Sequence, residues 1–213
     1  MPMPAARVHL VRHGEVHNPE GVLYGRLPNF RLSKRGLRMA QLAADDLASQ
    51  DRKISRLLAS PLERTQQSAA PVAAAFSLKV EVEPRIIEPS NVFEGKVVGL
   101  ATALRNPSIL VRLLNPIRPG WGEAYESIRA RMFAAIEEAA ASVADGDVIL
   151  VTHQLPIVMV QRSLSGRLLA HNPRVRRCSL SSITTLEKIH GKWVEIDYRE
   201  PAIKAHAVDR GAA

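Results

Sequence analysis

The sequence predicts an α/β fold: a three-layer sandwich with a mostly parallel central sheet, helices on both faces and an antiparallel edge. Strand-like and helix-like segments alternate along the 213 residues, which is the pattern of a sheet with helical connections. Several strand-like segments are continuously apolar, as strands covered on both faces are. Residues 179–198 have the pattern of a β-hairpin that turns near His190 and Gly191. Residues 1–213 fit a single domain.

Local patterning indicates the first strand and the first helix. The run ARVHLV at residues 6–11 is apolar and rich in valine, which predicts a buried strand. Residues 32–50 predict a helix whose N-cap is Ser33. The apolar residues that recur there at roughly helical intervals are Leu37, Ala40, Leu42, Ala44 and Leu47.

A second strand, a second helix and a third strand follow. The run ISRLLAS at residues 54–60 predicts a strand, and residues 61–76 predict a helix. We expect Pro61 to open this helix, because a proline at the first helical position loses no hydrogen bond. The run KVEVE at residues 79–83 predicts the third strand.

The second half of the chain begins with an irregular stretch. Residues 84–121 contain several prolines and predict a lid-like insertion with one or two short helices. Residues 122–144 give the longest helical pattern. Residues 147–153 predict the clearest strand, DVILVTH, and residues 154–166 predict the helix that follows it.

Composition limits the classes of partner and cofactor. The formal net charge of +8 favours an anionic partner. Only 4% of the residues are aromatic, and the single short basic run, RVRR at 174–177, is expected at the surface, so we predict no nucleic-acid partner. One cysteine, Cys178, and no Cys/His cluster predict neither a disulfide framework nor a metal or cofactor. We find no signal-like or membrane-length apolar segment and expect a cytoplasmic protein without membrane contact; the sequence does not predict its oligomeric state.

Polar side chains follow several predicted strands at the point where each strand ends. Arg12 and His13 end the first strand, Ser60 and then Arg64 follow the second, and His153 ends the VILVT strand. In open α/β sheets the ligand site lies beyond the carboxyl ends of the strands. We therefore expect two arginines and two histidines to converge at one edge of the sheet.

This set of residues suits phosphoryl transfer. A phosphate monoester is a dianion, and its reaction needs fixed positive charge around the non-bridging oxygens. Arginine pairs with two such oxygens and does not deprotonate, while a neutral imidazole can attack phosphorus. Gly14 would allow the backbone to approach the phosphoryl group closely. The expected partner is a small phosphorylated substrate.

The blocks LVRHGEV, LSKRG, ASPLERTQQSA and VTHQLPI resemble the histidine phosphatase superfamily, in its phosphoglycerate-mutase-like branch. The resemblance covers residues 6 to about 165 and implies the fold described above. It implies that His13 is the nucleophile that becomes phosphohistidine. It also implies that Arg12 and Arg64 bind the phosphoryl group and that His153 contacts it in the transition state.

The family's general acid is a glutamate on the loop after the third strand, so the resemblance implies this role for Glu88. Glu94 is the other carboxylate on this loop, and the choice between the two stays open. Two further phosphate contacts are expected from Asn18, which falls one residue earlier than in the family, and from Gln154. At Gln154 the family usually has glycine.

The resemblance implies a metal-independent phosphatase that acts on a small phosphorylated metabolite through phosphohistidine. One alternative is a 2,3-bisphosphoglycerate-dependent phosphoglycerate mutase, and another is a catalytically idle relative that binds a phosphorylated ligand. A mutase must keep its phosphoenzyme dry under a substantial lid. Because the insertion at 84–121 is modest, hydrolysis is favoured.

Overall fold

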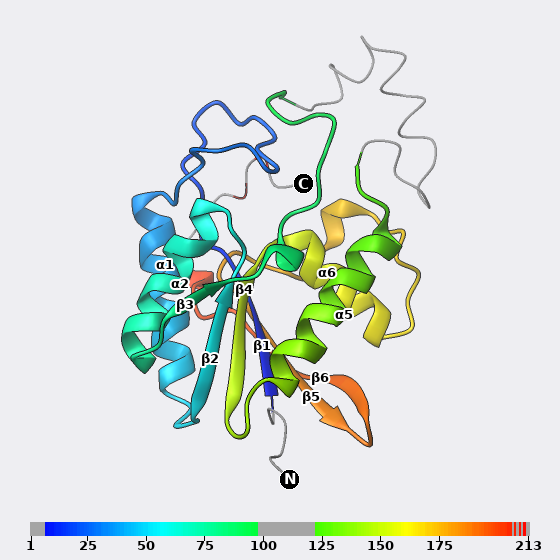
Figure 1. The fold of residues 1–213 in the computed structure, drawn as a ribbon. Coiled ribbons are helices and arrows are strands. Elements are labelled where there is room, and N and C mark those ends of the chain that lie inside the picture. Colours follow the sequence, from blue (N-terminus) through cyan, green and yellow to red (C-terminus); the bar gives the residue numbers. More distant parts are fainter. Residues whose placement is uncertain (1–6, 98–121, 206, 208, 210, 212–213) are drawn as a thin grey trace.

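A central sheet of six strands organises the molecule (Figure 1). The computed structural model describes residues 7–97, 122–205, 207, 209 and 211. The strand order is β3-β2-β4-β1-β5-β6. The first four strands in this order are parallel to one another, and β5 and β6 form the antiparallel edge. The strands are β1 Arg7–Arg12, β2 Ile54–Ala59, β3 Val80–Val82, β4 Asp147–Thr152, β5 Ile183–Ile189 and β6 Lys192–Arg199.

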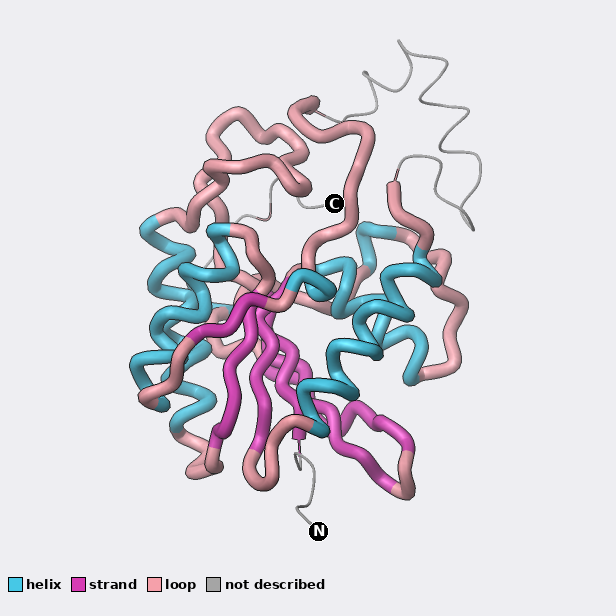
Figure 2. Tube along the Cα trace, in the orientation of Figure 1, coloured by secondary structure: helices cyan, strands magenta, loops and turns pink. Residues whose placement is uncertain are grey.

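Helices cover both faces of the sheet, which makes the predicted three layers (Figures 1 and 2). Helices α1 (Lys34–Ala48) and α2 (Glu63–Phe76) pack on one face. Helices α5 (Tyr125–Ala141) and α6 (Gln154–Leu164) pack on the other. The predicted α/β fold with a mostly parallel sheet is therefore confirmed.

The two central strands, β1 and β4, explain the continuous apolar runs in the sequence. In β4, Val148 and Leu150 belong to the core under α5 and α6, while Ile149 and Val151 belong to the core under α1 and α2. Successive side chains of a strand point to opposite faces. Both faces are covered here, so neither set of positions can be polar.

The first helix confirms the predicted cap, and two of its regularly spaced apolar residues are exposed. The Ser33 side chain accepts a hydrogen bond from Gly36 N at 2.9 Å, as an N-cap does. Leu37 and Leu42, however, are 49% and 41% exposed. The buried side of α1 is built mostly from glycine and alanine, because small side chains let the helix lie close to α2 and the sheet. Its buried residues are Gly36, Met39, Ala40, Ala43, Ala44 and Leu47.

Two further boundaries concern α2 and the hairpin. The N-cap of α2 is Leu62, so Pro61 precedes the helix and does not open it as predicted. The β5–β6 turn lies at His190 and Gly191, whose φ angles of 48° and 78° are those of a tight two-residue hairpin turn.

Only part of the predicted insertion belongs to the described chain. Residues 84–97 begin with the short 3-10 helix Pro84–Ile86 and continue as turns. Residues 98–121 lie outside the described residues, so the lid-like insertion and the single domain stay predictions. After β6 the chain forms a further 3-10 helix, Ile203–Ala205, and returns toward the loop at Tyr24, whose N–H donates to the Gly211 carbonyl oxygen at 3.2 Å.

A buried cluster of charged and polar side chains lies at the amino-terminal end of the parallel strands and connects β1, β4 and the segment before β2. The Asp147 carboxylate is fully buried and accepts hydrogen bonds from Arg52 Nε at 2.5 Å and His9 Nε2 at 3.3 Å. Burial raises the pKa of Asp147, but the hydrogen bonds from Arg52 and His9 outweigh burial and lower this pKa to about 2. His9 is thus a structural residue of β1. Among the helices of the described residues, none is long and apolar enough for a membrane span.

Candidate active site

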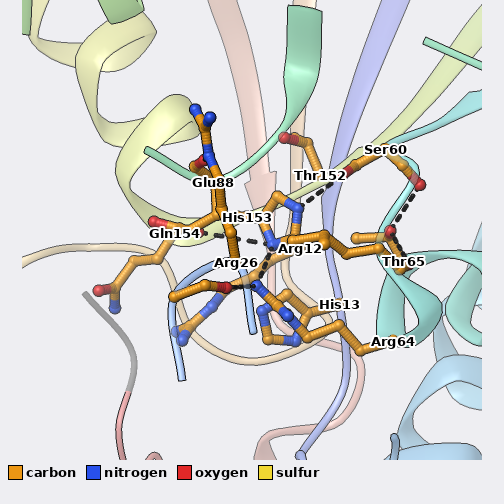
Figure 3. A network of polar contacts seen from close by, with 12 residues as sticks. Arg12, His13, Arg26, Ser60, Arg64, Thr65, Glu88, Thr152, His153 and Gln154 are labelled. Atoms are coloured by element: carbon orange, nitrogen blue, oxygen red, sulfur yellow. Dashed lines mark hydrogen bonds and ion pairs between the residues drawn. The ribbon is translucent and has the colours of Figure 1, made fainter. Parts of the chain in front are cut away.

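The carboxyl ends of three adjacent strands bring the predicted residues together (Figure 3). Strand β1 ends at Arg12, and the His13 N–H donates to the Thr152 carbonyl oxygen of β4 at 3.1 Å. Ser60 follows β2, and its N–H donates to the Val151 carbonyl oxygen at 3.0 Å. These contacts extend the parallel sheet by one residue past its ends and fix the backbones that carry the site.

His13 is buried and held in one orientation. Its Nδ1 lies 2.8 Å from the Gly14 carbonyl oxygen. Since a carbonyl oxygen only accepts, Nδ1 carries the proton and Nε2 has the lone pair in the neutral ring. Burial and the charges of Arg64 and Arg12 lower the His13 pKa well below its usual value. The imidazole is therefore neutral near pH 7 and can act as a nucleophile.

Gly14 lies in close contact with the backbone of α1. A Cβ at Gly14 would lie 2.4 Å from the Gly36 carbonyl oxygen of α1. The Gly14 N–H donates to Ser68 Oγ at 3.1 Å, and Ser68 donates in turn to the Arg64 carbonyl oxygen at 2.8 Å. Gly14 thus allows the RHG loop to lie against both α1 and α2.

Two buried arginines lie beside His13. Arg64 donates to the Gly25 carbonyl oxygen at 2.7 Å, and its guanidinium lies 4.8 Å from the ring centroid of Tyr24. Arg12 donates to the Cys178 carbonyl oxygen and to Asp209 Oδ2, both at 2.6 Å. These neighbours fix both guanidinium planes.

Three buried polar atoms at this site have no hydrogen-bond partner within the described part of the chain. They are Nε of Arg12, Nε of Arg64 and Oε1 of Glu88. Buried polar atoms of native proteins are nearly always paired. Two unpaired cationic donors and one unpaired carboxyl oxygen in one place indicate a site for an anion with a protonatable oxygen.

His153 lies between the second strand and the candidate acid. Its Nε2 is 2.8 Å from Ser60 Oγ, and its Nδ1 is 3.3 Å from Arg64 and 3.5 Å from Glu88 Oε2. The rings of His153 and His13 have centroids 5.2 Å apart. Burial and the nearby charge of Arg64 lower the His153 pKa well below its usual value.

Of the two carboxylates on the loop after β3, Glu88 is the one at the site. Its side chain is buried next to His153, and burial raises its pKa to about 6, against the opposing charges of Arg64, Arg176 and Arg12. The Glu94 carboxylate instead accepts backbone N–H bonds from Arg26 and Asn91, each at 3.1 Å. Glu94 therefore organises the loop.

The two other predicted phosphate contacts bind neighbouring loops in the described structure. Asn18 makes hydrogen bonds through both side-chain atoms to the backbone of Val22, at 2.8 and 3.2 Å. Gln154, the first residue of α6, accepts from Arg176 at 3.0 Å and donates to the Cys178 carbonyl oxygen at 3.4 Å. Phosphate contacts by either residue stay predictions.

The sequence placed Ser60 at this edge of the sheet, but gave it no role and missed three other neighbours of the site. Tyr24, Arg176 and Asp209 had no signal in the sequence, since each reaches the site through loops. The prediction that RVRR lies at the surface is wrong for Arg176, which is half-buried, although Arg177 is exposed.

Comparisons with known proteins give one family. Residues 8–200 match the family model of the histidine phosphatase superfamily (branch 1). A Mycobacterium tuberculosis protein named uncharacterized protein Rv0525 is 47% identical over 197 residues, covering 92% of this chain and 96% of that protein. The probable phosphoglycerate mutase GpmB of Yersinia pestis is 30% identical, covering 88% and 90%.

Solved structures show the same fold. The mycobacterial glucosyl-3-phosphoglycerate phosphatase Rv2419c, in complex with inorganic phosphate, superimposes with a TM-score of 0.75. The two chains are 22% identical, and the match covers 93% of this chain and all of the other (100%).

Proposed function

This chain belongs to the histidine phosphatase superfamily, and we propose that it is a metal-independent phosphatase that hydrolyses a small phosphorylated metabolite through a phosphohistidine at His13. The cluster of unpaired buried atoms, Arg12 Nε, Arg64 Nε and Glu88 Oε1, is the observation that carries the proposal. A bound phosphoryl group would accept from both arginines, and the leaving oxygen would take a proton from Glu88. In this proposal the partner is a small substrate, not nucleic acid or a membrane.

The first step transfers the phosphoryl group to the enzyme. His13 Nε2 attacks phosphorus, the bond from phosphorus to the leaving oxygen breaks, and Glu88 gives its proton to that oxygen. Arg12 and Arg64 balance the charge on the non-bridging oxygens. The fixed Nδ1–H···O bond to Gly14 keeps the His13 lone pair aimed at phosphorus and stabilises the charge that forms on the ring.

The second step returns the enzyme to its starting state. A water molecule attacks the phosphohistidine, and the Glu88 carboxylate takes the proton from that water. The bond between phosphorus and His13 Nε2 breaks, and inorganic phosphate leaves. Glu88 ends protonated and His13 ends neutral, so the cycle balances. A Glu88 pKa of about 6 suits a group that must both donate and accept a proton.

The charges in this scheme come from the protein alone. Arginine and histidine supply the positive groups that metal ions supply in other phosphatases. Activity on p-nitrophenyl phosphate should therefore persist in EDTA and should be lost in His13→Ala. Ligand binding without turnover by the intact chain would instead favour the idle relative.

The similarity to a protein named phosphoglycerate mutase favours a second candidate function, mutase activity. We favour hydrolysis because the insertion at 84–121 is short for a lid that must exclude water from a phosphoenzyme. The two are separated by incubation with 3-phosphoglycerate and a trace of 2,3-bisphosphoglycerate. A phosphatase releases inorganic phosphate, whereas a mutase interconverts the isomers with little release.

A further inference from the structure

The Tyr24 side chain lies against the phosphoryl site and has no role in the proposed mechanism. Only 2% of the residue is exposed, and its ring centroid is 6.5 Å from that of His13 in an edge-to-face contact. We propose that the Tyr24 hydroxyl donates a hydrogen bond to a non-bridging oxygen of the phosphoryl group. This inference rests on the proposed function, because it adds a neutral donor to the same site.

The ring and the backbone of Tyr24 hold it in place without its hydroxyl. The ring stacks on Phe30, with centroids 5.3 Å apart, and the Arg64 guanidinium lies 4.8 Å from the Tyr24 ring centroid. The Tyr24 carbonyl oxygen accepts from the Leu27 N–H at 2.7 Å. Aromatic stacking and cation–π contacts use the ring alone. The hydroxyl is therefore available for another contact.

The surroundings of the Tyr24 hydroxyl are those of the phosphoryl site. Among the described residues this hydroxyl has no hydrogen-bond partner, although a buried tyrosine hydroxyl usually finds one. The charged groups that act on its pKa come from four separate segments of the chain; they are Arg64, Arg12, Asp209 and Glu88. A nearly buried donor without a partner, placed among these groups, indicates a contact with a bound anion.

The Tyr24 hydroxyl keeps its proton under the conditions of the reaction. Burial raises the pKa of Tyr24 above its usual value, against the opposing charges of Arg64 and Arg12. The protonated hydroxyl is a neutral donor, so it binds an anion without adding positive charge to the site. The Asp209 carboxylate compensates part of the charge of Arg12 through the contact at 2.6 Å. A neutral donor does not depend on how much of that charge is compensated.

A third donor suits the chemistry of phosphoryl transfer. Charge in the transition state is spread over three non-bridging oxygens, and fixed donors in a buried site stabilise it. Arg12 Nε and Arg64 Nε are two such donors without a partner in the described chain, and the Tyr24 hydroxyl is the third. Because the contact is to the transferred group, its effect should be the same for every leaving group.

Tyr24→Phe removes the hydroxyl and keeps the ring contacts with Phe30 and Arg64. A purely packing role of Tyr24 would therefore leave this variant unchanged. Tyr198→Phe is the matched control, since Tyr198 lies on β6 at the edge of the sheet. The Tyr198 hydroxyl accepts from the Ser179 N–H at 3.0 Å and donates to Glu200 Oε1 at 2.8 Å.

The test measures anion binding and turnover separately. Dissociation constants of inorganic phosphate and orthovanadate are measured by calorimetry near neutral pH in the wild type, Tyr24→Phe and Tyr198→Phe. Neither anion has a leaving group, so a change in affinity reports contacts with phosphoryl-like oxygens. The value of kcat/KM is measured with p-nitrophenyl phosphate and glycerol 3-phosphate from about pH 5 to pH 9. Melting temperatures check that each variant is folded.

We expect Tyr24→Phe to raise the dissociation constant of orthovanadate ~10- to 100-fold, the effect of one hydrogen bond to a charged group. The value of kcat/KM should fall by a similar factor for both substrates. The alkaline limb of the pH profile should remain, because it belongs to Glu88. Tyr198→Phe should change neither the dissociation constants nor kcat/KM.

Unchanged dissociation constants of both anions in Tyr24→Phe overturn the assignment, whatever the rates are. An equal loss of affinity in Tyr198→Phe also overturns it, because the loss would then not depend on the site. Weaker anion binding that occurs only in Tyr24→Phe upholds the assignment. If the wild type then hydrolyses no compound, the phosphatase alone is refuted. Hydrolysis by the wild type together with unchanged anion binding in Tyr24→Phe refutes the role of Tyr24 alone.

Discussion

Glu88 sets the pH dependence that the proposed mechanism requires. The acid form of Glu88 is needed for the first step, and its pKa is about 6 because burial disfavours the carboxylate. The protonated fraction falls tenfold for each pH unit above this value. At about pH 8 it is ~1%, so kcat/KM should be ~100-fold below its acidic plateau. His13 does not limit this range, since its pKa lies well below the usual value.

The perturbation is Glu88→Gln, which keeps the size of the side chain and removes the acidic proton of the carboxyl group. We expect a loss of ~10²- to 10⁴-fold at acidic pH for glycerol 3-phosphate, whose leaving oxygen needs protonation. The loss should be much smaller for p-nitrophenyl phosphate, because nitrophenolate leaves without help. The falling alkaline limb should also disappear for the variant. The assay is kcat/KM from about pH 5 to pH 9 with both substrates.

Glu94→Gln is the matched control, since Glu94 caps the loop backbone. It should retain the alkaline limb and the ordinary dependence on the leaving group. The reasoning is refuted if the limb persists in Glu88→Gln, or if both substrates lose activity equally. A limb lost in Glu94→Gln instead would move the acid to the other carboxylate.

Three further perturbations test the surroundings of the site and the fold. Asp209→Asn removes the half-exposed carboxylate that pairs with Arg12 at 2.6 Å. If that carboxylate competes with phosphate for Arg12, the inhibition constant for inorganic phosphate should fall ~2- to 5-fold in steady-state kinetics. An unchanged inhibition constant contradicts this competition. The pKa of Asp147 is lowered from 3.8 to about 2. The ionised carboxylate therefore adds about 2 kcal/mol to the free energy of unfolding above pH ~4, and this contribution is lost as the pH falls toward ~2. Urea unfolding at neutral pH should show Asp147→Asn less stable by about that amount, and a variant as stable as the wild type would refute the linkage. Ser60→Ala removes the partner of His153 at 2.8 Å and should lower kcat ~10-fold with KM little changed, whereas a rise in KM alone would show a binding role.

The residues at the strand ends could be predicted because the end of a buried strand is visible in the local sequence. An apolar run that stops at Arg12 and His13, and another that stops at His153, place these side chains at one edge once the sheet is parallel. Glu88 required more than periodicity, since it lies on an irregular loop. Only the resemblance to a family indicated its role there, and the structure brings it next to His153.

What the sequence could not predict depends on contacts between distant segments. Asp209 lies 197 residues from Arg12 in the chain, and no periodic signal connects them. Arg176 lies in a basic run that is typical of a solvent-exposed surface. It is half-buried because of the path that its loop takes, which the sequence does not indicate. The exposure of Leu37 has a similar cause: α1 packs through Met39, Leu47 and the small residues between them, and Leu37 lies outside that face.

The phosphoenzyme is the most direct test of the central claim. Protein mixed with substrate and quenched in alkali should carry one phosphoryl group, stable to base and labile to acid, as phosphohistidine is. Peptide mapping should place it on His13, and His13→Ala should carry none and turn over no substrate. Phosphate on another residue, or undiminished turnover by His13→Ala, would contradict the account.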